Sequence, residues 1–73
     1  MPNNHLIKKS FRLSGHATSV ALEPVFWEIL QEIAAARNAS LATVVSDVDT
    51  QTPPNLASAL RVLAIRHLQK KSL

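Results

Sequence analysis

The chain has 73 residues, a formal net charge of +3 and no cysteine, which excludes disulfides and cysteine-ligated metals. So short a chain makes one small domain, yet 47% of its residues are hydrophobic; we therefore expect a second copy to complete the core, with a monomeric three-helix domain as the alternative. No apolar run has the length of a signal peptide or a membrane span, so a soluble cytoplasmic protein is predicted.

Charge is distributed unevenly along the chain. Residues 1–16 contain three basic residues and residues 55–73 contain four, and neither segment contains an acid. The segment 17–54 contains all five acidic residues and a single arginine. Basic ends around an acidic middle suit a polyanionic partner, although basic termini also serve solubility alone.

The first 15 residues are predicted to form a basic N-terminal arm. Its early residues favour turns and show no periodicity. Phe11 and Leu13 alternate with polar residues, which is compatible with a short strand that Gly15 ends or bends. The cations of the arm are Lys8, Lys9 and Arg12.

The main strand is expected at about residues 16–22. Val20 and Leu22 would face one side, and Ser19 and Ala21 the other. A single short strand ahead of helices has no partner in its own chain. We therefore expect it to pair with the same strand of a second molecule.

Two helices should follow and complete a core domain over residues 16–50. Pro24 suits the first turn of a helix that runs to Arg37 with a continuous apolar stripe. Asn38 can adopt the left-handed conformation that ends a helix, and Ser40 is expected to cap the next one. That second helix is rich in β-branched residues, so a strand is the rival interpretation of the same segment.

A linker and a third helix are predicted for residues 51–73. Pro53 and Pro54 cannot continue the second helix, and Asn55 is a suitable cap for the third. The apolar face of this helix would add to the core or cover a dimer. Alternatively, it would form a surface for a protein partner through residues 55–73. The leucines of this face are Leu56, Leu60 and Leu63.

The sequence contains no pattern of an enzyme. No two of its histidines, His5, His16 and His67, have metal-ligand spacing, and His67 is best interpreted as a structural residue. Gly15 is the sole glycine, which excludes a glycine-rich phosphate loop. No serine lies in a nucleophile motif. We therefore predict no catalytic residue, no metal site and no cofactor.

The order of strand, helix, short turn and helix resembles the ribbon-helix-helix family of the Arc/MetJ type. The segment from Gly15 to Trp27 looks closer to a bacterial subfamily with an extra C-terminal helix. The matching segments are Thr18–Pro24 for the strand and its exit, Phe26–Ile33 for the first helix, Asn38–Leu41 for the turn, and Val44–Val48 for the second helix.

This resemblance implies a mainly α-helical fold with one short strand, assembled as an intertwined homodimer. Its strands would form an intermolecular, two-stranded antiparallel ribbon that enters the major groove of double-stranded DNA, as in a transcriptional repressor. The implied dimer core is Val20, Leu22, Phe26, Leu30, Val44 and Val48. The implied DNA-binding residues are Ala17, Ser19 and Ala21 on the outward strand face, Lys8, Lys9, Arg12 and His16 before them, and Ser40 and Leu41 at a helix N-terminus.

Two alternatives remain open beside DNA binding by a ribbon. The first is an antitoxin-type module that binds protein through its C-terminal helix. The second is a helix-turn-helix arrangement of the first two helices. This second alternative is less favoured, because the second helix offers no Arg, Lys, Asn or Gln for base contacts apart from Gln51.

Overall fold

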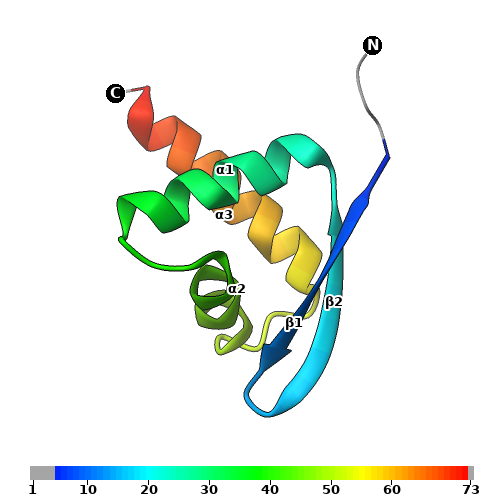
Figure 1. Cartoon of the computed structure of the whole chain (residues 1–73). Coiled ribbons are helices and arrows are strands. Elements are labelled where there is room, and N and C mark those ends of the chain that lie inside the picture. The colour runs from blue at the N-terminus through cyan, green and yellow to red at the C-terminus, as the bar shows by residue number, and fades with distance from the viewer. Residues whose placement is uncertain (1–4, 73) are drawn as a thin grey trace.

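A computed structural model describes residues 5–72 of the chain (Figure 1). It is mainly α-helical, as the ribbon-helix-helix resemblance predicts, and it contains one two-stranded antiparallel ribbon. The helices pack against one another, and the ribbon lies along one side of them. In chain order the elements are β1 (Ile7–Leu13), β2 (His16–Leu22), α1 (Pro24–Ala36), α2 (Leu41–Asp49) and α3 (Leu56–Lys71).

Both strands of the ribbon come from the same chain. β1 pairs with β2 from Ile7 opposite Leu22 to Leu13 opposite His16. The expectation that the strand before α1 finds no partner in its own chain is therefore wrong. A two-residue turn connects the two strands and lets them pair within the chain. Its residues Ser14 and Gly15 both have positive φ angles, 51° and 84°, as a type I′ hairpin turn requires.

The hairpin takes up most of the predicted basic arm. From Ile7 onward this segment is a strand rather than flexible chain. Residues 1–4, the start of the predicted arm, lie outside the described residues.

The local signals for the helices agree with the structure. Pro24 occupies the first turn of α1, and Asn38 follows the helix with a φ of 55°. The Ser40 side chain caps α2 by accepting a hydrogen bond from the Thr43 backbone N–H at 3.1 Å. Asn55 caps α3 in the same way, through the backbone N–H of Ser58 at 2.9 Å. The strand alternative for the second helix is wrong, since packing overrides the low helix propensity of its β-branched residues.

The chain closes its own core, and α3 contributes to this closure as predicted. Leu60 and Ala64 of α3 are completely buried. Of the six residues assigned to a dimer core, Phe26 is only half-buried. The other five are buried by their own chain, so a second copy is not needed to cover them: Val20, Leu22, Leu30, Val44 and Val48.

Trp27 connects the hairpin to α1. Its Nε1–H donates a hydrogen bond to the Ile7 carbonyl at 2.7 Å, and its ring lies 6.0 Å from that of Phe11. Lys9 places its ammonium 5.7 Å from the centre of the Trp27 ring. These contacts hold β1 against the helices and so determine which face of the ribbon remains open to solvent.

Candidate nucleic-acid interface

The outward face of the hairpin brings together side chains from both strands. Because side chains alternate along a strand, every second residue of β1 shares this face with its partner in β2. All of these side chains except that of Ala21 are well exposed. The opposed pairs are Lys8 with Ala21, Ser10 with Ser19, and Arg12 with Ala17.

Ser10 and Ser19 form the centre of this outward face. Their hydroxyl oxygens are 3.0 Å apart and share a hydrogen bond. Ser19 belongs to the predicted DNA-binding set, whereas Ser10 was missed. Its alternation with Lys8 and Arg12 is the signal that could have identified it, once β1 is recognised as a strand.

The long basic side chains of this face come from β1. Lys8 and Arg12 stand on either side of Ser10, opposite the two alanines of β2. The sequence alone indicates a reading strand with little more than Ser19 on its outward face. Hairpin formation instead places two cations beside that strand, at fixed positions in the register.

Lys9 and His16 do not share the outward face. Lys9 lies on the inner face, over the Trp27 ring. His16 is exposed next to the hairpin turn, opposite Leu13, and belongs by alternation to the inner face. The predicted DNA-binding residues of the arm therefore separate into two groups, and only Lys8 and Arg12 accompany the outward residues of β2.

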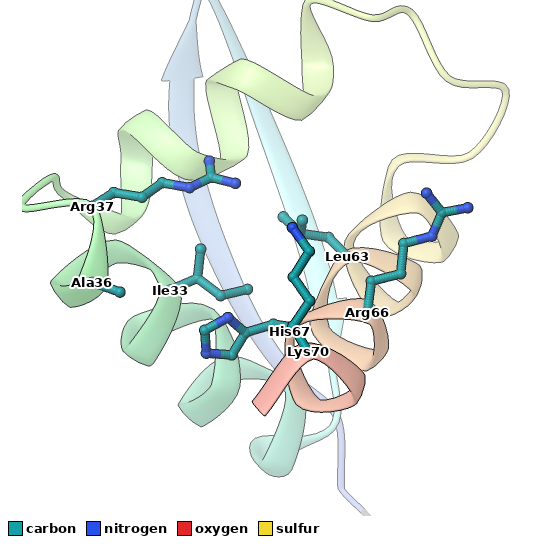
Figure 2. A pocket seen from close by; sticks show the side chains of 7 residues that line it. All are labelled: Ile33, Ala36, Arg37, Leu63, Arg66, His67 and Lys70. Carbon is teal, nitrogen blue, oxygen red and sulfur yellow. The ribbon is translucent and has the colours of Figure 1, made fainter. Parts of the chain in front are cut away.

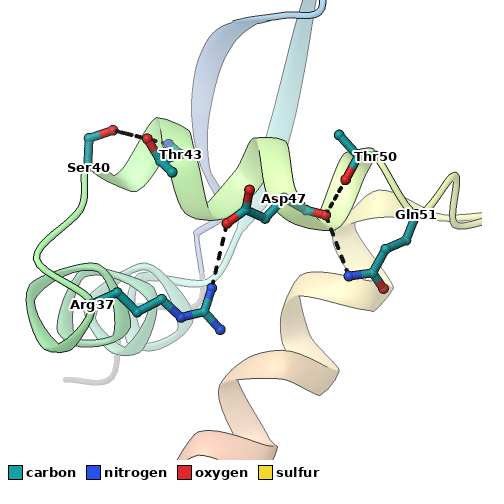
Figure 3. Close-up of polar contacts among 6 residues, drawn as sticks. All are labelled: Arg37, Ser40, Thr43, Asp47, Thr50 and Gln51. Atoms are coloured by element: carbon teal, nitrogen blue, oxygen red, sulfur yellow. Dashed lines mark hydrogen bonds and ion pairs between the residues drawn. The ribbon is translucent and has the colours of Figure 1, made fainter.

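Ser40 and Leu41 lie on a separate element, at the N-terminus of α2 (Figure 3). The Ser40 hydroxyl is 2.9 Å from that of Thr43 and also accepts from the Thr43 backbone N–H. Its backbone carbonyl accepts from the Val44 N–H. The N–H groups of Leu41 and Ala42 are left at the positive end of the helix, an arrangement suited to a phosphate.

Acidic side chains are absent from the hairpin, and several of those on the helical part of the chain are engaged with basic residues. The pKa of Glu23 lies below its usual value, chiefly because the carboxylate accepts a hydrogen bond from the Glu23 backbone N–H. A second hydrogen bond, from Arg61, lowers this pKa further. A hydrogen bond from Lys71 likewise lowers the pKa of Glu32. Asp47 lies 3.9 Å from Arg37 (Figure 3). Lys8 and Arg12 form no ion pair within residues 5–72, so their charges are available to an external anion.

The predicted protein-binding face of α3 is largely occupied by the core. Leu60 is fully buried, and Leu56 and Leu63 pack against the core while partly exposed. The exposed apolar side chains of α3 lie on its other side, at Val62, Ile65 and Leu68. A partner that binds α3 would therefore meet a different face from the one that the sequence indicated.

Neither a membrane span nor a metal cluster accompanies this surface in the part of the chain that the structure describes. None of the helices within residues 5–72 is long and apolar enough to cross a membrane. Over the same residues, no group of three or more His, Cys, Asp or Glu side chains could hold a metal ion.

Comparison with known proteins identifies the family. Residues 6–68 match the model of a family described as the ribbon-helix-helix domain. The solved structure of an uncharacterized protein from Bordetella pertussis Tohama I is similar, with a TM-score of 0.81 and 34% sequence identity. The match covers 92% of this chain but 58% of that one. No curated protein matches the chain. The chain therefore belongs to the ribbon-helix-helix family, whose members are in general DNA-binding regulators.

Proposed function

We propose that this chain acts as a homodimeric transcriptional repressor that presents the outward face of its β-ribbon to the major groove of double-stranded DNA. The observation that carries the proposal is the outward face of the hairpin, where Lys8 and Arg12 flank a pair of serine hydroxyls and no acid is present. Two-stranded antiparallel ribbons have the width that the major groove admits.

The division of this face suggests a role for each kind of side chain. Lys8 and Arg12 are long enough to reach phosphates, and Arg12 can also donate two hydrogen bonds to a guanine. Ser10 and Ser19 can donate to or accept from a base edge, while Ala17 and Ala21 can contact a thymine methyl group. Small central side chains would let the backbone of the ribbon approach the bases closely. We therefore expect affinity to come mainly from phosphates and sequence preference to be modest.

A second copy has a suitable place to bind at the free edge of β2. The register makes Leu13–His16 a hydrogen-bonded pair, so the backbone groups of Ser10 and Ser19 point away from the partner strand. At the β1 edge, Lys8 and Arg12 flank Ser10, and charged side chains discourage edge pairing. At the β2 edge, only alanines flank Ser19 on the outward face. We therefore place the dimer interface at β2, with a two-fold axis beside Ser19.

This arrangement predicts a four-stranded sheet in which the two β2 strands are central. This central pair has the width of a two-stranded ribbon and would enter the major groove, with the two β1 strands along its margins. The outward faces of both hairpins would lie on the same side of the sheet, because the two-fold axis is perpendicular to it. A dimer would present Lys8 and Arg12 twice, four cations in total. With about 0.9 in slope for each phosphate contact, log affinity should fall against log salt with a slope of about −3 to −4.

Salt-dependent binding of duplex DNA by single-charge variants tests the proposal. Lys8→Gln should weaken binding at every salt concentration and reduce the slope by about 2 per dimer. Lys9→Gln removes the same charge from the neighbouring residue, but from the inner face, and should leave the slope unchanged. Circular dichroism would verify that both variants are folded. Fluorescence anisotropy with labelled duplexes, at several salt concentrations, gives both quantities.

Two outcomes would contradict this assignment. If Lys9→Gln weakened binding as much as Lys8→Gln, net charge rather than the outward face would account for affinity. If the wild-type protein bound no duplex even at low salt, the DNA proposal would fail. Protein binding through the exposed Val62, Ile65 and Leu68 side of α3 would then be the better candidate.

A further inference from the structure

A cleft of about 380 Å³ opens between the C-terminal halves of α1 and α3 (Figure 2). Its volume lies within the range of sites for small molecules. Ile33, Ala36 and Leu63 supply an apolar lining, with Ile33 almost fully buried. The cleft contains no residue of the hairpin, and Figure 2 shows the hairpin behind the helices that form it. The cleft is therefore separate from the proposed DNA-binding face.

The rim of the cleft is strongly basic. Arg37 reaches across from the end of α1, and Lys70 extends from α3 toward the same opening (Figure 2). Arg66 contributes a third cation, and the His67 ring forms part of the wall. No carboxylate lines the cleft among the described residues. An anion in this position would meet several donors and no carboxylate among the residues that line the cleft.

The acids nearest to this rim are already engaged. Glu32 binds Lys71 and lies 3.6 Å from the Nε2 atom of His67. Asp47 approaches Arg37, but their 3.9 Å separation on an exposed surface makes a weak ion pair. Arg66 and Lys70 form no ion pair within residues 5–72. These two cations are thus available to a ligand, and Arg37 is engaged only in its weak pair with Asp47.

The end of α1 does not prevent an anion from binding here. A helix C-terminus normally carries partial negative charge on its unpaired carbonyls. Here the carbonyls of Ile33, Ala34 and Ala35 accept hydrogen bonds from the backbone N–H groups of Arg37, Asn38 and Ala39. The carbonyls that would repel an anion are therefore largely hydrogen-bonded within the chain. The rim residues Arg66 and Lys70, by contrast, have no ion-pair partner within residues 5–72.

We propose that this cleft binds a small organic carboxylate with an apolar body, such as an aromatic acid. The apolar body would lie on Ile33 and Leu63, and the carboxylate would be held between Arg37 and Lys70. Both parts of the ligand are needed, because the side chains of the rim are exposed and an ion alone would remain hydrated. The site is independent of the hairpin, so occupancy does not require DNA.

Methyl-detected NMR of the full chain provides the test, with benzoate as the probe. Benzoate should shift the methyl signals of Ile33 and Leu63 in a saturable manner. Acetate, which has the charge without the ring, and benzyl alcohol, which has the ring without the charge, should each bind at least about tenfold more weakly. Equal binding of benzyl alcohol would overturn the proposal, as would the absence of any benzoate shift.

Charge-matched double variants identify the residues responsible. Arg37→Gln with Lys70→Gln should weaken benzoate binding about tenfold or more, through the loss of charge-assisted hydrogen bonds. Lys8→Gln with Arg12→Gln removes the same charge from the hairpin and should leave benzoate binding unchanged. Equal weakening by both pairs would mean non-specific attraction and refute the site. If the first pair abolished duplex binding as completely as the second, the cleft would belong to the DNA surface instead.

Discussion

Lys8 and Lys9 show that a shift of one position along a strand changes the face of the ribbon on which a side chain lies. They are neighbours with the same chemistry, yet Lys8 is on the outward face and Lys9 lies over the Trp27 ring. Pairing with β2 fixes this difference, since a slip of one residue would exchange the two faces. Trp27 helps to secure the register through its hydrogen bond to the Ile7 carbonyl.

Replacing Trp27 with Phe measures the contribution of that hydrogen bond. The variant retains a ring near Phe11 but loses the donor that the Ile7 carbonyl accepts from at 2.7 Å. We expect the free energy of unfolding to fall by at least about 1 kcal/mol, since the smaller buried ring adds to the usual net value of one hydrogen bond. Urea denaturation followed by circular dichroism gives this quantity.

Hydrogen exchange locates the effect of the same variant. Amide protons at the start of β1 should exchange faster in Trp27→Phe, while those of α3 should change only with global stability. Unchanged stability together with unchanged exchange in β1 would show that the bond does not anchor the hairpin.

The hairpin is the element on which the sequence interpretation and the structure differ most. Alternation in both strands is visible in the sequence, and Ser14–Gly15 is a turn signal between them. The local pattern could not decide whether β2 pairs with β1 or with a second molecule. The backbone groups at the edge of an alternating strand can bond to a strand of the same chain or to one of another chain. The choice depends on a turn geometry and on contacts with Trp27, which is 20 residues from Ile7.

The two serines at the hairpin centre provide a matched test of which edge a second copy uses. In Ser19→Cys, two β2 strands paired about this residue would bring the thiols within reach of a disulfide, so mild oxidation should yield a covalent dimer. In Ser10→Cys the thiols would be separated by three strand spacings, about 14 Å, and should not cross-link. Non-reducing electrophoresis distinguishes the two. Efficient cross-linking through Ser10 alone would place the interface at β1 instead.

The helices followed from the sequence more completely than the hairpin did, because their signals are local. Ser40 and Asn55 cap helices through hydrogen bonds to residues three positions ahead. The candidate site was predicted in part: Ala17, Ser19 and Ala21 share a face, as alternation requires. Ser10 and the cleft beside Arg37 and Lys70 were not predicted, since they arise only when separate elements are packed together.

At the scale of the whole molecule, α3 replaces what a second chain had been expected to supply. The hydrophobic content of a 73-residue chain suggested a core shared between two copies. Instead, α3 packs against α1, α2 and β2, and its Leu60 and Ala64 are inaccessible to solvent. The chain is therefore expected to fold around its own core, and the proposed dimer would form through the edge of the ribbon.

The contribution of α3 to the core can be measured by replacing Leu60 or Leu68 with alanine. Leu60 is completely buried, whereas Leu68 is 37% exposed on the same helix. Leu60→Ala should lower the free energy of unfolding by about 2–5 kcal/mol, through lost burial and the cavity that remains. That is a large part of the stability of a small domain, roughly 5–15 kcal/mol. Leu68→Ala should cost less than about 1 kcal/mol, because water can fill the space at the surface. Urea denaturation at a single protein concentration compares the variants, and equal, small losses would mean that α3 does not close the core.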